Sequence, residues 1–131
     1  MEIIAHGIDI IETDRVADMA ERYGDRFLDR ILTPTEKQYC FGRRNWKPHI
    51  AGRFAAKEAV LKVLGTGWRK GMAWTDIEIT NTELGSPSVA LSHYTADLAR
   101  QKGIETILLS ITHTPNYASA SAIGLGRSPE P

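Results

Sequence analysis

The sequence contains a single cysteine, Cys40, so no disulfide bond can form within one chain. A lone thiol is typical of a protein in a reducing compartment, and the simplest role for Cys40 is that of a small packed apolar side chain. No apolar run approaches the roughly 20 residues that a transmembrane helix needs, and the N-terminal residues lack the pattern of a secretory signal peptide. We therefore expect a cytoplasmic protein with no membrane association.

A net charge is also absent, because 16 Lys and Arg residues balance 16 Asp and Glu residues. The charges are nevertheless unevenly distributed: the segment 37–70 holds nine basic residues and one acid, Glu58. A focused basic segment in a neutral chain indicates a compact anionic ligand or partner. It argues against general nucleic-acid binding, for which the whole domain is usually basic. A solvated basic surface without a ligand is the alternative.

The order of the predicted elements indicates the fold class. Strands are expected at 2–12, 76–80, 88–91, 105–112 and 117–125, and helices at 14–23, 49–64 and 92–102, with short helical segments between 27 and 41 and a loop at 42–48. This order predicts an α+β fold in which a mainly antiparallel sheet packs against a long buried helix. We expect a single domain over residues 1–126, followed by a flexible tail over residues 127–131.

The segment 49–64, HIAGRFAAKEAVLKVL, is apolar nearly all round, which is typical of a buried helix. The glycines of Gly65-Thr66-Gly67 end it. Glu58 is therefore a carboxylate in an apolar environment. One explanation is an ion pair with Lys62, four residues further along the helix.

Asp9 presents the same problem in the strand EIIAHGIDIIE, residues 2–12. A strand this apolar is expected to be buried, and a buried carboxylate is costly unless its charge is compensated. Backbone amides or a core arginine would satisfy Asp9. Alternatively, Asp9 and Glu58 share a divalent cation, since Mg²⁺ is typically held by one or two carboxylates together with waters and substrate phosphates. Asp9 would then pair with an ion that arrives with the substrate rather than with another side chain, and Gly7 would leave room for the ligand.

Basic side chains on the predicted helix favour a phosphorylated substrate. Arg53 and Lys57 lie one helical step apart, and Lys62 lies on the same strip as Glu58. Cations beside a metal site suit phosphate groups. The sequence has no zinc-like spacing of histidines and cysteines and no Walker loop. His113, at the end of the strand 105–112, is either a further site residue or an ordinary packed or surface histidine.

Three segments resemble the signatures of holo-acyl-carrier-protein synthases, which belong to the 4′-phosphopantetheinyl transferase superfamily. They are GIDIIE at 7–12, RFAAKEAVLKVLGTG at 53–67 and SITHTPNYASASAI at 110–123. The resemblance covers nearly the whole chain. It implies transfer of the 4′-phosphopantetheine arm of coenzyme A to a serine of apo acyl carrier protein, with release of adenosine 3′,5′-bisphosphate, in fatty acid biosynthesis. It also implies a homotrimer whose active sites lie where subunits meet.

The resemblance implies roles for particular residues as well. Asp9 and Glu58 match the magnesium ligands, and Lys62 matches a lysine that faces the pyrophosphate. Glu58, directly or through a metal-bound water, is the candidate base for the serine proton. The positions expected to bind coenzyme A are Arg53, Lys57, Gly65, Gly85, Pro87, Thr112 and His113.

The carrier protein must dock as well, and carriers of this family are acidic. The basic residues expected to meet it in the first helices are Arg15, Arg22, Arg26 and Arg30. Acids are interleaved with these arginines, so pairing within the helices is the alternative.

Two positions depart from the family pattern. Thr112 stands where serine is usual and keeps the hydroxyl, and Ser86 stands where lysine is common, which removes a cation near the nucleotide. Two other functions stay open. One is a different magnesium-dependent phosphate enzyme, such as a small nucleotide or coenzyme A hydrolase, and the other is a non-catalytic coenzyme A-binding module.

Overall fold

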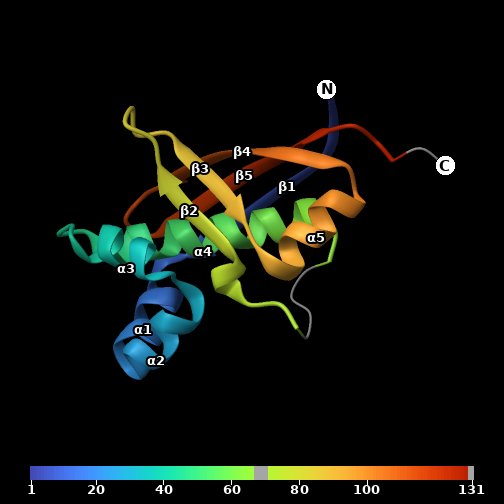
Figure 1. Ribbon diagram of the computed structural model, residues 1–131. Helices are drawn as coiled ribbons and strands as arrows, with labels where there is room; N and C mark the ends of the chain where they lie inside the picture. Colours follow the sequence, from blue (N-terminus) through green and yellow to red (C-terminus); the bar gives the residue numbers. More distant parts are fainter. Residues whose placement is uncertain (67–70, 130–131) are drawn as a thin grey trace.

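The computed structural model describes residues 1–66 and 71–129 (Figure 1). Its elements follow the order β1 (Glu2–Glu12), α1 (Thr13–Tyr23), α2 (Asp25–Ile31), α3 (Pro34–Phe41), α4 (Trp46–Leu64), β2 (Ile77–Asn81), β3 (Pro87–Leu91), α5 (His93–Gln101), β4 (Ile104–His113) and β5 (Tyr117–Gly126). A short 3₁₀ turn, Trp74–Asp76, precedes β2. The α+β order expected from the sequence is confirmed.

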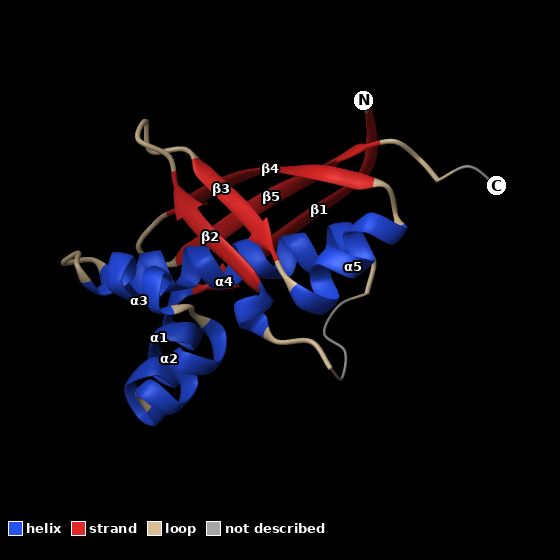
Figure 2. Ribbon diagram, viewed as in Figure 1, coloured by secondary structure: helices blue, strands red, loops and turns tan. Residues whose placement is uncertain are grey.

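Two antiparallel sheets flank the long helix α4. In the three-stranded sheet β5 lies between β1 and β4, while β2 and β3 form a separate hairpin. Figure 2 shows the hairpin crossing in front of α4, with β1, β5 and β4 behind the helix. Asp9 of β1 lies opposite Ala120 of β5, so residues far apart in the sequence are neighbours in the sheet.

The helix α4 forms the core, as its apolar sequence predicts. Its buried alanines pack with the small side chains of Ala120 and Ala122 on β5, which allow helix and sheet to approach closely. The closest approach is at Gly7, where an added Cβ atom would lie 2.2 Å from the carbonyl oxygen of Ala59 and 2.9 Å from Cβ of Lys62. The expectation that Gly7 leaves room for a ligand is therefore wrong, because α4 occupies that space.

The ends of α4 differ partly from the prediction. The helix begins at Trp46, so the last residues of the predicted loop 42–48 are helical. Pro48 is tolerated there because the first turn of a helix leaves its N–H groups without partners inside the helix. Gly65 ends the helix with a left-handed φ of 77°, as expected, whereas Gly67 lies outside the described residues.

The strand β1 is buried on one face only. On the other face Ile8 and Ile10 are 58% and 66% exposed, and they share this outer face of the sheet with Leu108 of β4. The prediction of a wholly buried strand is therefore wrong. Within the described residues no element covers this outer face, and an exposed apolar patch of this kind marks an interaction surface.

The structure bears on two features of the sequence, its single cysteine and its lack of long apolar runs. Cys40 is fully buried, and burial raises the pKa of its thiol to about 11, so it is a protonated packed side chain, as expected. Among residues 1–66 and 71–129, no helix has the length and apolar character needed to cross a bilayer. The strand β5 ends at Gly126, and the domain boundary at residue 126 stays a prediction. The tail stays a prediction, since Glu130 and Pro131 lie outside the described residues.

Candidate functional site

Eight of the predicted site residues line one of two hollows. The larger, of about 1110 Å³, lies where α1, α2 and α4 meet β1, and it is called the carboxylate pocket here. The predicted residues that line it are Asp9, Glu58, Arg15 and Arg22. The smaller, of about 150 Å³, is called the arginine pocket, and the predicted residues that line it are Arg53, Gly85, Pro87 and His113.

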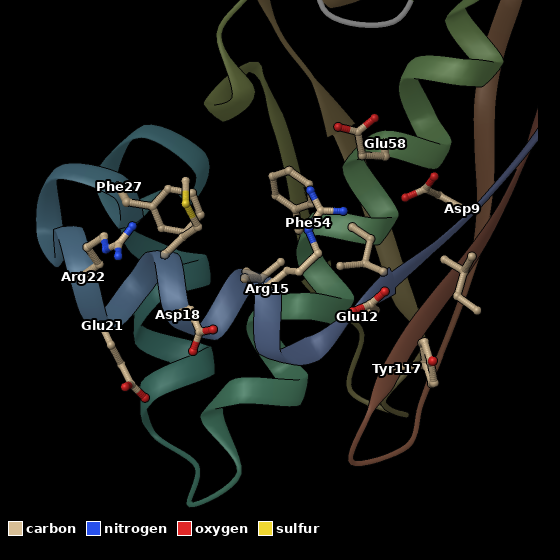
Figure 3. Close-up of a pocket in the computed structure, with 14 residues that line it drawn as sticks. Asp9, Glu12, Arg15, Asp18, Glu21, Arg22, Phe27, Phe54, Glu58 and Tyr117 are labelled. Carbon is tan, nitrogen blue, oxygen red and sulfur yellow. The ribbon is translucent and has the colours of Figure 1, made fainter.

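The carboxylate pocket brings Asp9 and Glu58 together. Figure 3 shows Asp9 on β1 and Glu58 on α4 with their carboxylates on the same side of the pocket. Burial raises the pKa of Glu58, and the charge of Asp9 raises it further, against a smaller opposing effect of Lys62. Among the residues that the structure describes, Glu58 has no hydrogen-bond or ion-pair partner. An ion pair with Lys62 therefore does not explain Glu58.

Lys62 pairs with Asp9 instead. Its Nζ donates to Oδ1 of Asp9 at 3.0 Å and to the carbonyl oxygen of Ile8 at 2.7 Å. The expectation that no side chain pairs with Asp9 is therefore wrong. The Lys62 side chain is 51% exposed, and an ion pair this open is worth only about 0–1 kcal/mol. The ammonium group of Lys62 is therefore held only weakly beside Asp9.

The donor atoms of this pocket fit a hard divalent cation. Asp9 and the half-buried Glu58, which has no partner in the part of the chain that the structure describes, supply the oxygen ligands that Mg²⁺ prefers. Within the described ranges no group of three or more His, Cys, Asp or Glu side chains is placed to hold a metal. The chain alone would therefore leave most coordination positions to water and to a substrate.

The wall of the carboxylate pocket formed by α1 is partly apolar and carries charges of both signs, because Asp18 and Glu21 line it as well as arginines. Arg15 and Arg22 of α1 line it beside Met19, Phe27 and Phe54 (Figure 3). The other predicted docking residues, Arg26 and Arg30, lie on α2 outside the lining.

Pairing within the helices does not use up these four arginines. The neighbouring acids that form ion pairs do so with lysines, since Lys37 binds Asp25 and Asp29 and Lys47 binds Glu21. In the part of the chain that the structure describes, Arg15, Arg22, Arg26 and Arg30 form no ion pair. All four are therefore available to an acidic partner.

The arginine pocket is built around Arg53, which is only 4% exposed. Its guanidinium lies 4.4 Å from the ring centre of Tyr39, and Nη2 donates to Oδ1 of Asn81 at 2.6 Å. Its Nε is buried and has no hydrogen-bond partner among the described residues. A buried donor without an acceptor is costly in a folded protein, so it indicates a place for a bound acceptor.

Histidine rings extend this pocket. The ring centre of His49 lies 5.3 Å from that of His113 and 5.6 Å from that of Tyr39, and all three rings line the hollow. Burial lowers the pKa of His49, and the nearby His113, Arg43 and Arg53 lower it further. Among the described residues, no carboxylate lines the arginine pocket, so its positive charge is uncompensated. This arrangement is typical of an anion site.

Sequence reasoning missed His49, Tyr39 and Asn81. The excess of basic residues in 37–70 indicated an anionic ligand, and His49 and Tyr39 lie inside that segment. Asn81 comes from the hairpin, and nothing in its local sequence distinguishes it from a turn residue. Its position depends on how the hairpin packs against α4, which the sequence pattern does not give.

The prediction that Lys57 binds coenzyme A is wrong. Lys57 is fully buried, and its Nζ donates to Oε1 of Glu36 at 2.7 Å, to the carbonyl oxygen of Ile31 at 2.7 Å and to that of Trp74 at 3.1 Å. Oε2 of Glu36 accepts from the backbone N–H of Ile79 at 2.8 Å. The Lys57–Glu36 pair therefore ties α4 to α2, α3 and β2, and Lys57 has no route to a ligand.

Two further predicted residues lie away from both pockets. Gly65 is the left-handed residue that ends α4. Thr112 lies on the outer face of the sheet, opposite Ser119, whereas its neighbour His113 lines the arginine pocket. Their roles in binding coenzyme A stay predictions.

Comparisons with known proteins point to one family. The family model of the 4′-phosphopantetheinyl transferase superfamily matches residues 5–118. The chain is 46% identical over 126 residues to the holo-[acyl-carrier-protein] synthase of Caldanaerobacter subterraneus subsp. tengcongensis, covering 96% of this chain and 97% of that protein. The crystal structure of Helicobacter pylori holo-[acyl-carrier-protein] synthase in complex with coenzyme A is similar, with a TM-score of 0.81 and 31% identity over 92% of this chain and 100% of that one. A Bacillus anthracis holo-(acyl-carrier-protein) synthase in complex with CoA (3′,5′-ADP) has a TM-score of 0.76 and 35% identity, covering 93% and 96% of the two chains.

The buried position of Lys57 gives a stability prediction. The substitution Lys57→Met leaves Glu36 as an uncompensated buried charge, so the free energy of unfolding should fall by about 3–5 kcal/mol. Urea denaturation followed by circular dichroism measures this change. The control is Lys62→Met on the same helix, which should cost less than about 1 kcal/mol because that ion pair is open to solvent. Equal stability of Lys57→Met and the wild type would contradict a structural role for Lys57.

Proposed function

The chain belongs to the 4′-phosphopantetheinyl transferase superfamily, as one of its holo-acyl-carrier-protein synthases, and from the two pockets we propose how its residues divide the work. The enzyme transfers the 4′-phosphopantetheine group of coenzyme A to apo acyl carrier protein. One observation supports our assignment above all. Asp9 and Glu58 line the same pocket, while Arg53, whose buried Nε has no partner among the described residues, lines a second pocket that holds no acid among those residues.

We propose that Asp9 and Glu58 hold the divalent metal, Mg²⁺. When bound, this ion would neutralise the negative charge that develops on the pyrophosphate oxygens while a bond within the pyrophosphate breaks. Lys62 would then exchange its contact with Asp9 for one with the phosphate oxygens, which its exposure and weak pairing allow. A buried carboxylate next to a second acid is expected to lose its proton less readily, and the raised pKa of Glu58 suits it to accept one.

We propose a chemical step in which one oxygen–phosphorus bond forms and another breaks. The serine oxygen of the carrier attacks the β-phosphorus of coenzyme A, and Glu58 takes the serine proton, directly or through water. The bond from the β-phosphorus to the oxygen of the α-phosphate breaks, and adenosine 3′,5′-bisphosphate leaves with that oxygen. Most of the acceleration comes from positioning and from charge stabilisation, as in other phosphoryl-type transfers.

We assign the nucleotide end of coenzyme A to the arginine pocket. Arg53 and His113 would meet its 3′-phosphate, and the turn at Gly85 and Pro87 would approach the adenine. The orphaned Nε of Arg53 supports this assignment, since a phosphate oxygen is the acceptor that it lacks.

We propose that the carrier docks at the mouth of the carboxylate pocket. Arg15 and Arg22 form no ion pair with any described residue, and Met19, Phe27 and Phe54 add an apolar surface beside them. An acidic protein with an exposed apolar side chain fits this combination, and docking there would bring its serine close to Glu58.

We propose a homotrimer with active sites at the subunit interfaces. The outer face of the sheet, with Ile8, Ile10 and Leu108, is the surface that supports self-association, and the number three comes from the family resemblance. An interface site would allow the carboxylate pocket of one subunit to meet the arginine pocket of another. A cytoplasmic location fits the buried, protonated thiol of Cys40.

The reaction is tested by weighing an apo acyl carrier protein after incubation with the enzyme, coenzyme A and Mg²⁺. The wild type should add the mass of one phosphopantetheine group, and Asp9→Ala should abolish the gain because one of two metal ligands is lost. Asp97→Ala on α5, outside both pockets, should keep full activity. Consumption of coenzyme A without any gain in carrier mass would point to a hydrolase, and binding without turnover would point to a binding module.

Docking is tested by reversing one charge in the proposed surface. Arg22→Glu should raise KM for the carrier about tenfold or more at low salt, with little change in kcat, because like charges oppose encounter with an acidic partner. The effect should shrink as ionic strength rises. Arg100→Glu on α5, away from both pockets, is the matched control. If Arg22→Glu and Arg100→Glu have the same KM for the carrier, the carrier docks on a different surface.

Assembly is tested by placing a charge on the outer face of the sheet. Ile8→Glu should shift the protein from trimer to monomer in analytical ultracentrifugation, since a carboxylate would be buried at the interface. Leu84→Glu, at the 97% exposed tip of the hairpin, should leave the trimer intact. A wild-type protein that sediments as a monomer at micromolar concentration would refute the proposal.

A further inference from the structure

Among the described residues that line the arginine pocket, His49 is a histidine to which neither the fold nor the family signatures assign a task. We propose that His49 is a specificity-determining residue, which takes up a proton from solvent when a phosphate monoester enters this pocket and thereby favours ligands that carry that group. No covalent bond forms or breaks in this step. The inference rests on the proposed role of the pocket as the nucleotide site.

Packing holds the His49 ring in place at the wall of the pocket. His49 lies in the first turns of α4, and its ring meets two others nearly edge-on, that of Tyr39 from α3 at 5.6 Å and that of His113 from the end of β4 at 5.3 Å. Because all three rings line the same hollow as Arg53, a ligand bound to Arg53 also lies beside His49.

The groups around His49 carry positive charge or none. Arg43, which follows α3, lies 4.1 Å from the ring centre of Tyr39, and Arg53 of α4 lies 4.4 Å from it. His113 approaches from β4, and Tyr39 is the remaining titratable neighbour. Burial, His113 and the two arginines hold the pKa of His49 below its usual 6.5, so the ring is neutral near pH 7 in the free protein.

A bound dianion reverses this balance. Negative charge beside an imidazole favours the protonated ring, so the pKa of His49 rises when the anion binds and proton uptake accompanies binding. A phosphate monoester has its second pKa near 6 and is largely dianionic at neutral pH. Coenzyme A carries one such group, the 3′-phosphate, and dephospho-coenzyme A lacks it. His49 therefore favours coenzyme A over dephospho-coenzyme A. This preference is strongest at pH values at which the imidazole of the complex is protonated.

The test compares coenzyme A with dephospho-coenzyme A by isothermal titration calorimetry at about pH 6 and about pH 8.5. The variant is His49→Phe, which keeps an aromatic ring at this position. We expect His49→Phe to weaken coenzyme A binding about tenfold near pH 6, the strength of one charge-assisted hydrogen bond. Near pH 8.5 the wild type and His49→Phe should bind coenzyme A with nearly equal dissociation constants, because the wild-type ring is then neutral. Binding of dephospho-coenzyme A should change less than about twofold at either pH.

Two controls separate a ligand contact from a packing role. His49→Gln, the second variant, keeps a polar group without the charge and should show the same loss of pH dependence. His93→Asn removes a histidine outside both pockets, at a residue with a left-handed φ of 52° that asparagine tolerates, and should match the wild type. NMR titration of the histidine rings of the wild type should show the pKa of His49 rising when adenosine 3′,5′-bisphosphate is added.

Two results would overturn the proposal. The first is equal loss of affinity for both ligands in the variants, or a loss that is the same at both pH values. The second is an unchanged pKa of His49 in the presence of adenosine 3′,5′-bisphosphate. In both cases the wild type would still bind coenzyme A, so the proposed function would survive. Failure of the wild-type protein to bind coenzyme A at all would overturn the nucleotide site itself and the inference with it.

Discussion

The contact between β1 and α4 at Gly7 determines much of the rest of the structure. With no side chain at this residue, the strand approaches the helix backbone so closely that even a methyl group would collide with the carbonyl oxygen of Ala59. Asp9 lies two residues further along the same face of β1, and Glu58 and Lys62 flank the contact on α4. The two carboxylates are therefore neighbours because the backbones beneath them touch, and a rigid arrangement of this kind suits a metal site.

The same helix presents its charged residues to separate environments. Arg53 faces the hairpin and the arginine pocket, Lys57 closes a buried network with Glu36, and Glu58 and Lys62 face β1. Only the second of these environments is sealed from solvent. Helical periodicity thus points the charged residues of one short motif in different directions, and the buried Lys57 fixes the helix against α3 and the hairpin.

Much of this was predictable from the sequence. The apolar helix, its left-handed end at Gly65 and the antiparallel strands follow from local patterns, and Asp9 and Glu58 stood out as acids in apolar segments. The failures share one cause. Which apolar face of β1 is covered, which acid binds Lys57 and what fills the space beside Gly7 all depend on residues distant in the sequence. Periodicity reports that a residue is buried or exposed, but it does not identify the residue across the interface.

The order of strands also sets when this site comes into being. The central strand of the main sheet, β5, is made after both of its neighbours, and β1, which carries Asp9, has no other strand partner among the described residues. During synthesis on the ribosome, the first strand must therefore wait for the last one before its backbone is paired. A growing chain that already contains every charged residue of both pockets still lacks the support that aligns Asp9 with Glu58. We therefore expect both pockets to take shape only after β5 has paired with β1 and β4.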